Sequence, residues 1–313
     1  MVPANETFGG TFPFQPNFNS ASGFQMHYVD EGKGDVILCL HGEPTWGYLY
    51  RNFIPVLSKN HRVIVPDHMG FGKSETPKDR EYTFKSHVEN LIAFMDDLGL
   101  KDITVVAQDW GGPIIGSVAL RRPELIRRFC LMNTMLGYSG ALKDAPDTGI
   151  KDITPIHKSP WFTWITSNLE NGVYHQVMEN IHENILSVMK KLYFHNSAAV
   201  DQHWMDAYSA PFKNPEDRIA AIEFPLDVAL NRIGPFVVEG IKMGNIEQVR
   251  SKPAMLAEGM LDKAMPPALV MDDFKKLFPK GPIVEIPNAG HFCQEDTPQV
   301  LTSLILQFIQ LTD

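Results

Sequence analysis

Short apolar runs recur along the chain, and several of them are apolar throughout instead of alternating with polar residues. The clearest are Phe24–Val29, Val36–Leu40, Arg62–Val65, Ile103–Ala107, Phe129–Met132, Ala254–Ala257 and Ile283–Ile286. Uninterrupted runs of this kind are typical of strands covered on both faces in a mostly parallel sheet. Helical spacing of apolar residues is clearest in Phe84–Leu98 and Thr302–Leu311. The alternation of strands and helices predicts a doubly wound α/β fold.

The strand pattern stops after Asn133 and resumes only near Ala254. From about residue 137 to residue 217 the chain contains helix-like pieces rich in aromatic residues, His and Met. We interpret residues 137–217 as a helical cap, and residues 1–136 and 218–313 as the core domain into which it is inserted. Such a cap is expected over the carboxyl ends of the strands, where open α/β sheets bind their ligands.

Composition limits the class of protein. The chain has 313 residues, 44% of them hydrophobic and 21% charged, with a net charge of −9. This is ordinary for a globular protein, and no basic stripe interrupts the acidic balance, so we expect neither nucleic acid nor a membrane as a partner. The start of the chain has no signal-peptide pattern, and Cys39, Cys130 and Cys293 cannot all pair with one another. We therefore expect a cytoplasmic protein with free thiols.

The chemistry is clearest where the run Ile103–Ala107 ends. Gln108-Asp109-Trp110-Gly111-Gly112 follows it, and a helix-like stretch comes next. This is the pattern of a nucleophile elbow, a sharp turn between strand and helix that presents one side chain above the sheet. Asp109 stands where a serine is usual. A carboxylate there can displace a leaving group from a saturated carbon and form an alkyl ester.

An oxyanion hole is expected in the loop after the run Val36–Leu40. His41-Gly42-Glu43-Pro44 occupies that loop, so the backbone N–H groups of Glu43 and Trp110 are the candidate donors. A simple turn is the alternative interpretation of His-Gly after a strand. The position of this loop relative to the elbow favours the oxyanion hole.

The remaining partners of the elbow are a histidine and an acid that orients it. His291 follows the last predicted strand and is led by small residues, and the other histidines lack this setting. Asp262 lies in the loop after Ala254–Ala257. A rival position for the acid, after Phe129–Met132, holds Asn133 and no carboxylate, and Glu258 is a fallback. No histidine spacing suggests a metal site, and we expect neither metal nor cofactor.

With these residues placed, the chain resembles a haloalkane dehalogenase of the α/β-hydrolase superfamily. Gln-Asp-Trp-Gly-Gly at 108–112 combined with His-Gly-Glu-Pro-Thr-Trp at 41–46 is the most specific part of the likeness. Other matching stretches are Phe12–Asn17, Pro66–Ser74, Tyr208–Phe212 and Gly290–Glu295. The resemblance implies an α/β-hydrolase fold with a mostly parallel eight-stranded sheet and a helical cap inserted after the sixth strand.

The resemblance also implies a reaction and its partners. Asp109 would attack the carbon that bears the halogen, and His291, oriented by Asp262, would activate the water that cleaves the ester. The substrate would be a small apolar halogenated alkane, with an alcohol and a halide ion as products. The enzyme is expected to act as a monomer.

Two indoles are implied as halide donors, because an indole N–H donates and cannot accept. Trp110 is the first. An ionised Glu43 would repel halide, and the branch of the family with His-Gly-Glu-Pro uses a tryptophan from the cap instead. Trp164 is the choice for this second donor and Trp161 the runner-up.

Other functions remain open. An epoxide hydrolase would share Asp109 and the ester mechanism, with Tyr174, Tyr193 or Tyr208 protonating the epoxide oxygen. A catalytically silent binding protein on the same scaffold is the alternative from another class. The presence of Asp109, Asp262 and His291 together favours an enzyme.

Overall fold

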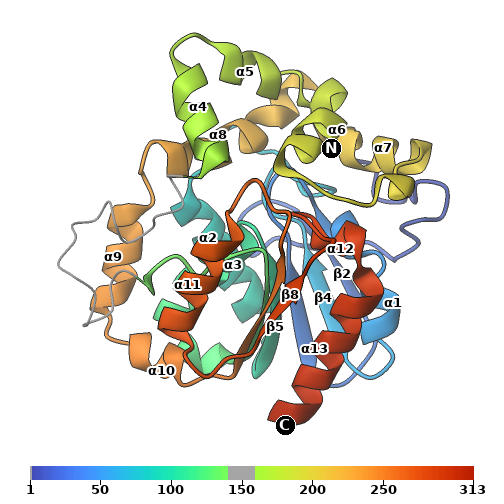
Figure 1. Cartoon of the computed structure of the whole chain (residues 1–313). Coiled ribbons are helices and arrows are strands. Elements are labelled where there is room, and N and C mark those ends of the chain that lie inside the picture. The colour runs from blue at the N-terminus through green and yellow to red at the C-terminus, as the bar shows by residue number, and fades with distance from the viewer. Residues whose placement is uncertain (1, 140–158) are drawn as a thin grey trace.

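A computed structural model describes residues 2–139 and 159–313. These residues form one eight-stranded sheet in the order β1-β2-β4-β3-β5-β6-β7-β8 (Figure 1). β1 and β2 pair antiparallel, β2 also pairs antiparallel with β4, and the other neighbours are parallel. The strands are β1 (Asn17–Asn19), β2 (Met26–Glu31), β3 (Val36–Leu40), β4 (Arg62–Pro66), β5 (Ile103–Gln108), β6 (Ile126–Met132), β7 (Ala254–Gly259) and β8 (Ile283–Ile286).

Helices cover both faces of this sheet, as the sequence predicts. α1 and α13 pack together on one side, whereas α2, α3 and α9 pack together on the other (Figure 1). The core helices are α1 (Ile54–Leu57), α2 (Phe84–Asp97), α3 (Gly111–Arg121), α9 (Gly234–Lys242), α10 (Ile246–Arg250), α11 (Pro267–Leu277), α12 (Cys293–Asp296) and α13 (Pro298–Thr312), with 3-10 turns η1 (Gly47–Tyr50) and η2 (Pro123–Leu125). The predicted α/β-hydrolase architecture is confirmed.

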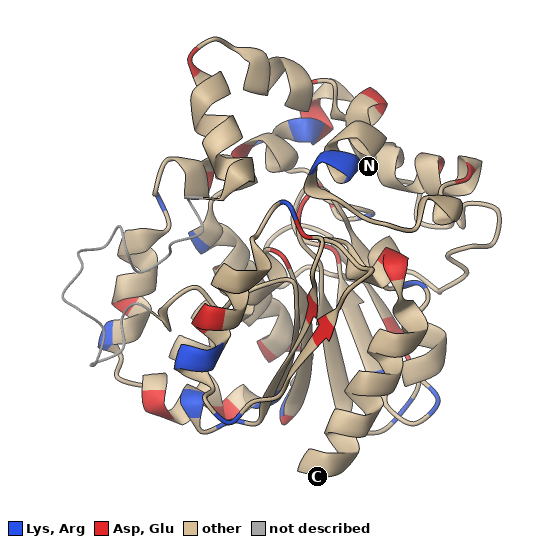
Figure 2. Cartoon of the chain, in the orientation of Figure 1, with Lys and Arg blue, Asp and Glu red and all other residues tan. Residues whose placement is uncertain are grey.

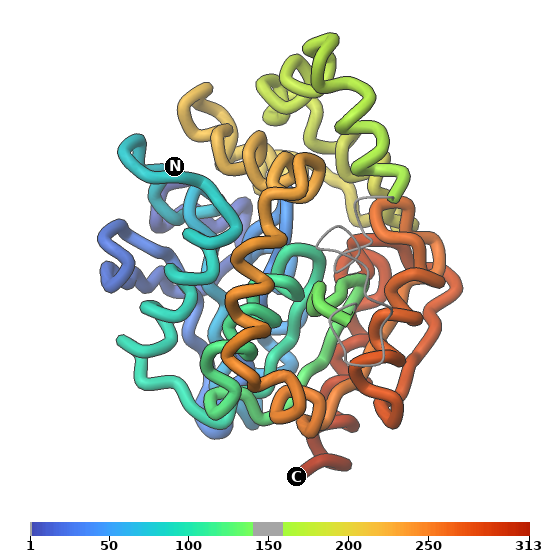
Figure 3. Tube along the Cα trace, turned by 90° about the vertical axis from the view of Figure 1, so that its left-hand side faces the viewer, coloured from blue at the N-terminus to red at the C-terminus, as the bar shows by residue number. Residues whose placement is uncertain are grey.

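A layer of helices lies over one end of the sheet (Figure 3). It contains α4 (Pro160–Leu169), α5 (Val173–Met178), α6 (Ile181–Leu192), α7 (Gln202–Ser209) and α8 (Ile219–Ala229), with 3-10 turns η6 (Ser197–Ala199), η7 (Ala210–Phe212) and η8 (Pro215–Arg218). The predicted cap boundary at residue 217 falls just before α8, and α8 packs against α4 and α5. Residues 140–158 of the predicted cap lie outside the described residues.

Local signals in the sequence account for where several helices begin. The Thr83 hydroxyl accepts a hydrogen bond from the backbone N–H of Ser86 at 3.2 Å, and so caps α2. The Asp201 carboxylate caps α7 by accepting from the N–H of Trp204 at 2.8 Å. Each cap satisfies an N–H that has no partner inside the helix.

Two polar contacts fasten the cap to the core. The Trp46 indole donates to the carbonyl oxygen of Ala207 at 2.9 Å. The Tyr208 hydroxyl donates to Oε1 of Glu295, whose two carboxylate oxygens also accept from Arg51 at 2.6 and 2.8 Å. The Glu295 side chain is buried, and these hydrogen bonds compensate its charge within the protein. The bond from Tyr208 also holds α7 in a fixed position over the sheet.

The centre of the sheet forms the core. Every residue of β5 is buried, as expected for a strand with helices on both faces. Cys39, Cys130 and Cys293 are free and buried, which confirms the sequence expectation of buried thiols. No helix in the described part of the chain is long and apolar enough to cross a membrane.

Candidate active site

Asp109 occupies a sharp turn between β5 and α3. Its φ of 50° lies in the left-handed region, which a residue with a side chain adopts at an energetic cost. The turn is held from β6, because the carbonyl oxygen of Asn133 accepts from the N–H of Asp109 at 3.4 Å. The Thr134 hydroxyl donates to the carbonyl oxygen of Asp109 at 2.5 Å. The predicted elbow is therefore present, and it points the Asp109 carboxylate away from the strand.

Three glycines make room for this turn. A Cβ on Gly42 would lie 2.0 Å from Oδ1 of Asp109, and one on Gly112 would lie 2.1 Å from Oγ1 of Thr134. At Gly111 it would lie 2.5 Å from the carbonyl oxygen of Leu40. The small residues flanking the elbow in the sequence are thus explained by close approach of neighbouring atoms.

The three predicted triad residues come together at the carboxyl ends of the strands. Nε2 of His291 lies 3.2 Å from Oδ2 of Asp109, and Nδ1 of His291 lies 2.9 Å from Oδ2 of Asp262. His291 is fully buried, whereas the Asp109 side chain keeps 18% of its surface accessible. The imidazole therefore links the two carboxylates, and only the carboxylate at the elbow is open to a small molecule.

Charge controls the titration of this histidine. Burial alone would lower the pKa of His291, because it disfavours the imidazolium. The charge of Asp262, together with hydrogen bonds to Asp109 and Asp262, outweighs burial and raises the pKa to about 10. The two neighbouring carboxylates therefore favour the imidazolium form of His291 in the free enzyme.

Asp262 is fixed by four hydrogen bonds. Oδ1 accepts from the N–H groups of Ala264 and Met265 at 2.7 and 2.9 Å. Oδ2 accepts from Nδ2 of Asn133 at 2.9 Å as well as facing His291. These donors hold the Asp262 carboxylate in place against Nδ1 of His291. The ring nitrogen that faces this carboxylate is therefore the one that carries a proton.

Asn133 is a functional residue that the sequence reasoning missed. It was considered only as a position for an acid and set aside because it is not one. The structure places its amide between β6 and the loop after β7, where it also accepts from the N–H of Gly259 at 2.9 Å. Its φ of 43° was not visible in the sequence. The available signal was an Asn directly after a predicted strand, because Asn tolerates the left-handed region better than most residues with a side chain.

Gln108 also supports the histidine. Its Nε2 donates to the carbonyl oxygen of His291 at 3.0 Å and lies 3.2 Å from Nε2 of the same residue. The fallback acid, Glu258, is buried at the end of β7, and its Oε1 accepts from Nδ2 of Asn133 at 3.3 Å. Burial, with a contribution from the Asp262 charge, raises the pKa of Glu258 well above its usual range. Asp262, and not Glu258, is the carboxylate that contacts Nδ1 of His291.

One of the two predicted oxyanion donors, Glu43, contacts the Asp109 carboxylate, and the role of Trp110 stays a prediction. The backbone N–H of Glu43 donates to Oδ1 of Asp109 at 2.8 Å. Trp110 is the N-cap residue of α3, so its N–H has no acceptor inside that helix. The positive end of the α3 dipole adds to the stabilisation of negative charge at this position. Oδ1 thus occupies a site for an oxyanion, and Oδ2 is left on the side of His291.

The side chain of Glu43 behaves differently from the sequence expectation. It is buried, and desolvation and then the Asp109 charge raise its pKa well above the usual range, with His291 acting in the opposite direction. Burial therefore favours the protonated form of this carboxyl. That uncharged form does not repel a halide as an ionised Glu43 would.

The predicted halide donors lie on both sides of the cap boundary. The Trp110 ring stacks on Phe224 of α8, with centroids 4.5 Å apart and planes at 10°. Trp164 and Trp161 stack on each other within α4 at 5.2 Å and 12°, and Trp164 lies 6.3 Å from the Tyr174 ring. Neither α4 indole stacks on or hydrogen-bonds a triad residue in the described part of the chain. The choice between them stays a prediction.

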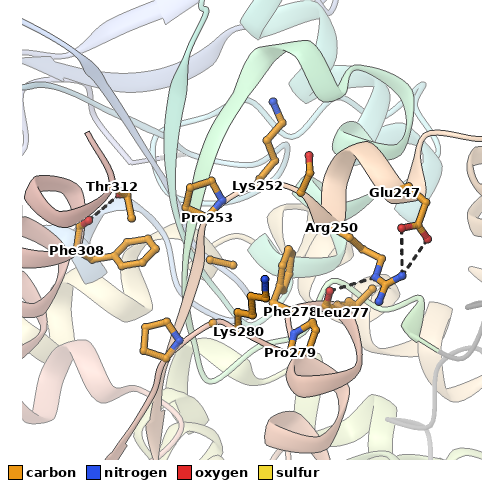
Figure 4. Close-up of a pocket in the computed structure, with 14 residues that line it drawn as sticks. Glu247, Arg250, Lys252, Pro253, Leu277, Phe278, Pro279, Lys280, Phe308 and Thr312 are labelled. Carbon is orange, nitrogen blue, oxygen red and sulfur yellow. Dashed lines mark hydrogen bonds and ion pairs between the residues drawn. The ribbon is translucent and has the colours of Figure 1, made fainter.

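A large cavity elsewhere in the molecule is distinct from this site. It has a volume of about 610 Å³ and is lined by residues of α10, α11 and α13 and by the segment that enters β7 (Figure 4). Arg250 donates there to Glu247 and to the carbonyl oxygen of Leu277. Because this cavity lies at the amino end of β7, it faces the edge of the sheet opposite to Asp109.

Comparison with known proteins agrees with this geometry. Residues 35–168 match the α/β-hydrolase fold family. Haloalkane dehalogenase 2 of Mycobacterium tuberculosis is 30% identical over 306 residues, which cover 95% of both chains. The chain belongs to the haloalkane dehalogenase family. The tetrameric haloalkane dehalogenase DpaA of Paraglaciecola agarilytica is 30% identical, with a TM-score of 0.72, and the match covers 95% of this chain and 93% of that one.

The family also has a neighbour with another activity. The cis-3-alkyl-4-alkyloxetan-2-one decarboxylase of Shewanella oneidensis is 29% identical over 306 residues, covering 96% of this chain and 90% of that protein. Similarity over the whole chain therefore does not by itself choose between the two reactions.

Proposed function

We propose that this family member hydrolyses haloalkanes to an alcohol, a halide ion and a proton. The observation that carries the proposal is the arrangement of Asp109: its Oδ1 accepts from the Glu43 N–H, and its Oδ2 faces His291, which is backed by Asp262. A carboxylate held in this way presents one oxygen for bond formation and keeps the other in a site that stabilises charge.

In the first step Oδ2 of Asp109 attacks the carbon that bears the halogen, from the side opposite to the halogen. The new C–O bond forms as the carbon–halogen bond breaks, and the electron pair of that bond leaves with the halide. The developing halide needs donors in a site that excludes water. The Trp110 indole is proposed as one, and Trp164 as the second with Trp161 as the alternative.

In the second step water cleaves the ester. Ester formation removes the negative charge of Asp109, which is one of the contributions that raise the pKa of His291. The pKa of His291 therefore falls in the ester, and the neutral imidazole can accept a proton from water. Hydroxide adds to the Asp109 carboxyl carbon, and the oxyanion forms at the Glu43 and Trp110 N–H groups. Collapse releases the alcohol and restores the carboxylate.

The hydroxyl groups of the cap bear on the epoxide hydrolase alternative. The Tyr174 hydroxyl donates to the carbonyl oxygen of Ile222 at 2.6 Å, and the Tyr208 hydroxyl donates to Glu295 at 2.5 Å. A tyrosine that already donates to a protein acceptor is not available to protonate an epoxide oxygen. This leaves Tyr193 of the three candidates, and dehalogenation is the better supported reaction.

The similarity to the Shewanella decarboxylase favours a second candidate substrate, a cis-3-alkyl-4-alkyloxetan-2-one. The same carboxylate could open a strained ring at a saturated carbon. A panel of 1-chloro-, 1-bromo- and 1-iodoalkanes, a dialkyl oxetanone and styrene oxide separates the reactions. Halide release that disappears in Asp109→Asn supports dehalogenation, whereas turnover of the oxetanone or the epoxide with no halide release contradicts it.

A further inference from the structure

A cavity of about 340 Å³ lies where the cap meets the core, and three lysines form most of its lining. Lys190 and Lys191 are in the last turn of α6, and Lys263 is in the loop after β7. Pro160 and Trp161, at the start of α4, complete the lining. We name this space the lysine cavity. It is separate from the contacts that hold the triad, although Lys263 directly follows Asp262.

The three ammonium groups have aromatic partners and no acidic ones. Lys191 Nζ lies 4.6 Å above the Trp164 ring, and Lys263 Nζ lies 4.6 Å above the Tyr193 ring. Lys190 Nζ lies 3.9 Å above the Phe194 ring and donates to the Ser197 hydroxyl. None of the carboxylates in residues 2–139 and 159–313 forms an ion pair with these lysines. A cation held on an aromatic face keeps N–H donors for an anion.

This positive cluster stands in a chain whose net charge is −9. Ribbon coloured for Lys and Arg is visible in the cap, close to the upper end of the sheet (Figure 2). Favourable interaction with the end of the α6 dipole accounts for Lys190 and Lys191. It does not account for Lys263, which comes from the core. The backbone N–H of Lys263 donates to the carbonyl oxygen of Leu192 at 3.1 Å, so the fold itself holds the third cation beside the other two.

The size and walls of the lysine cavity indicate the class of anion. Its volume of about 340 Å³ is larger than a single halide ion fills. The Trp161 ring and the methylene stems of the lysines supply an apolar wall. A site that combines cations with apolar walls fits an organic anion with a carboxylate at one end of an alkyl chain.

The lysine cavity lies beside the loop that carries the acid of the triad. Trp161, which lines the cavity, stacks on Trp164 in the cap. Lys263, which also lines it, directly follows Asp262, and Oδ2 of Asp262 lies 2.9 Å from Nδ1 of His291. The lysine cavity is therefore at the same end of the sheet as Asp109.

We propose that the lysine cavity binds the carboxylate of a substrate whose halogen is at the other end of its alkyl chain. The substrates that the enzyme prefers are then ω-haloalkanoic acids. The choice of substrate class rests on the proposed dehalogenase function, whereas the binding of a carboxylate at the three lysines does not.

Binding is tested with hexanoate, a ligand that carries no halogen. Isothermal titration calorimetry on the full chain would compare wild type with K190Q/K191Q/K263Q and with a control, K33Q/K59Q/K101Q, in which three exposed lysines before the starts of β3, β4 and β5 are changed. We expect hexanoate to bind wild type and the control alike and the cavity variant at least about tenfold more weakly. K263Q alone, in an exposed loop, serves if the triple variant does not fold, with a smaller loss expected.

Hexan-1-ol and bromide are the other two arms. Equal affinity of wild type and the cavity variant for hexanoate, or no hexanoate binding to wild type, overturns the proposal. Lysine-dependent binding of bromide without binding of hexanoate also overturns it, since the site would then take the halide and not an organic anion.

Kinetics then tests the substrate class. The ratio of kcat/KM for 6-bromohexanoate to that for 6-bromohexan-1-ol is expected to fall at least about tenfold in the cavity variant, and to fall with added salt in wild type. An unchanged ratio contradicts the proposal even when hexanoate binds. Absence of bromide release from every substrate contradicts the proposed dehalogenation instead, and the hexanoate titration still decides whether the lysines bind a carboxylate.

Discussion

Asn133 donates a hydrogen bond from Nδ2 to Oδ2 of Asp262 at 2.9 Å, and the same oxygen faces Nδ1 of His291. An amide at the end of β6 therefore positions the acid that orients the histidine. This contact joins two neighbouring strands of the sheet through their side chains. It makes the geometry of the triad depend on a residue that does not touch the substrate.

Asn133→Ala should slow hydrolysis of the ester more than its formation. Loss of one hydrogen bond to a charged carboxylate is expected to cost about tenfold in the rate of the step that needs His291 as a base. Rapid-quench mass spectrometry would show a larger steady-state fraction of ester than in wild type. Asn288→Ala, at an exposed position, is the control. Equal ester fractions in all three proteins would remove Asn133 from this role.

The pH dependence should differ between the two chemical steps. The pKa of His291 in the free enzyme is raised to about 10, and the protonated imidazole cannot accept a proton from water. Hydrolysis therefore slows as the pH falls below the pKa that His291 has in the ester, whereas attack by Asp109 needs only its carboxylate. The ester fraction should rise as the pH is lowered from about 9 to about 6. A fraction independent of pH would show that His291 is not the base.

Glu43→Gln should leave the pH profile of turnover in place. Burial and the Asp109 charge raise the pKa of Glu43 and favour its uncharged form, and an amide has a shape similar to that form. We expect kcat to change by less than about threefold at neutral pH, because no charge is removed next to Asp109. Turnover of bromobutane measured across the pH range checks this. A displacement of the profile by about one pH unit or more would show that Glu43 is ionised.

Arg51→Met should destabilise the protein. Arg51 makes two hydrogen bonds to the buried carboxylate of Glu295, which also accepts from Tyr208 of the cap. Removing one partner of a buried pair is expected to lower the free energy of unfolding by about 3–5 kcal/mol.

Urea denaturation measures this change, and Arg127→Met is the matched control. Arg127 pairs with Asp35 and Asp313 at the surface, where each such pair contributes about 0–1 kcal/mol. Equal losses in the two variants would contradict a special role for the link between Arg51 and the cap.

Much of the site could be predicted from the sequence because its parts are local. The elbow combines an apolar strand, small residues and Asp109 within a few positions, and chain order together with placement just after predicted strands then points to Asp262 and His291. Each of these signals depends on residues adjacent in sequence. The turn at Asp109 and its φ of 50° agree with that local reasoning.

What the sequence missed depends on contacts between distant segments. The sequence does not show that Glu43 is buried, and burial raises the pKa of its carboxyl well above the usual range. The role of Asn133 was missed because Asp262, which accepts its hydrogen bond, lies 129 positions later in the chain. β1 was not predicted, because a strand of three residues carries almost no pattern. The packing of α8 with the cap follows from its contacts with α4 and α5, which hydrophobic spacing does not specify.

The central claim is that Asp109 forms a covalent bond to the carbon of the substrate. His291→Phe removes the base for hydrolysis and leaves the nucleophile in place, so exposure of this variant to 1-bromohexane followed by mass spectrometry of its peptides tests the claim directly. The account predicts one added hexyl group on the peptide that contains Asp109, and its absence from Asp109→Asn/His291→Phe. Bromide release with no adduct on that peptide, or an adduct at another residue, would contradict it.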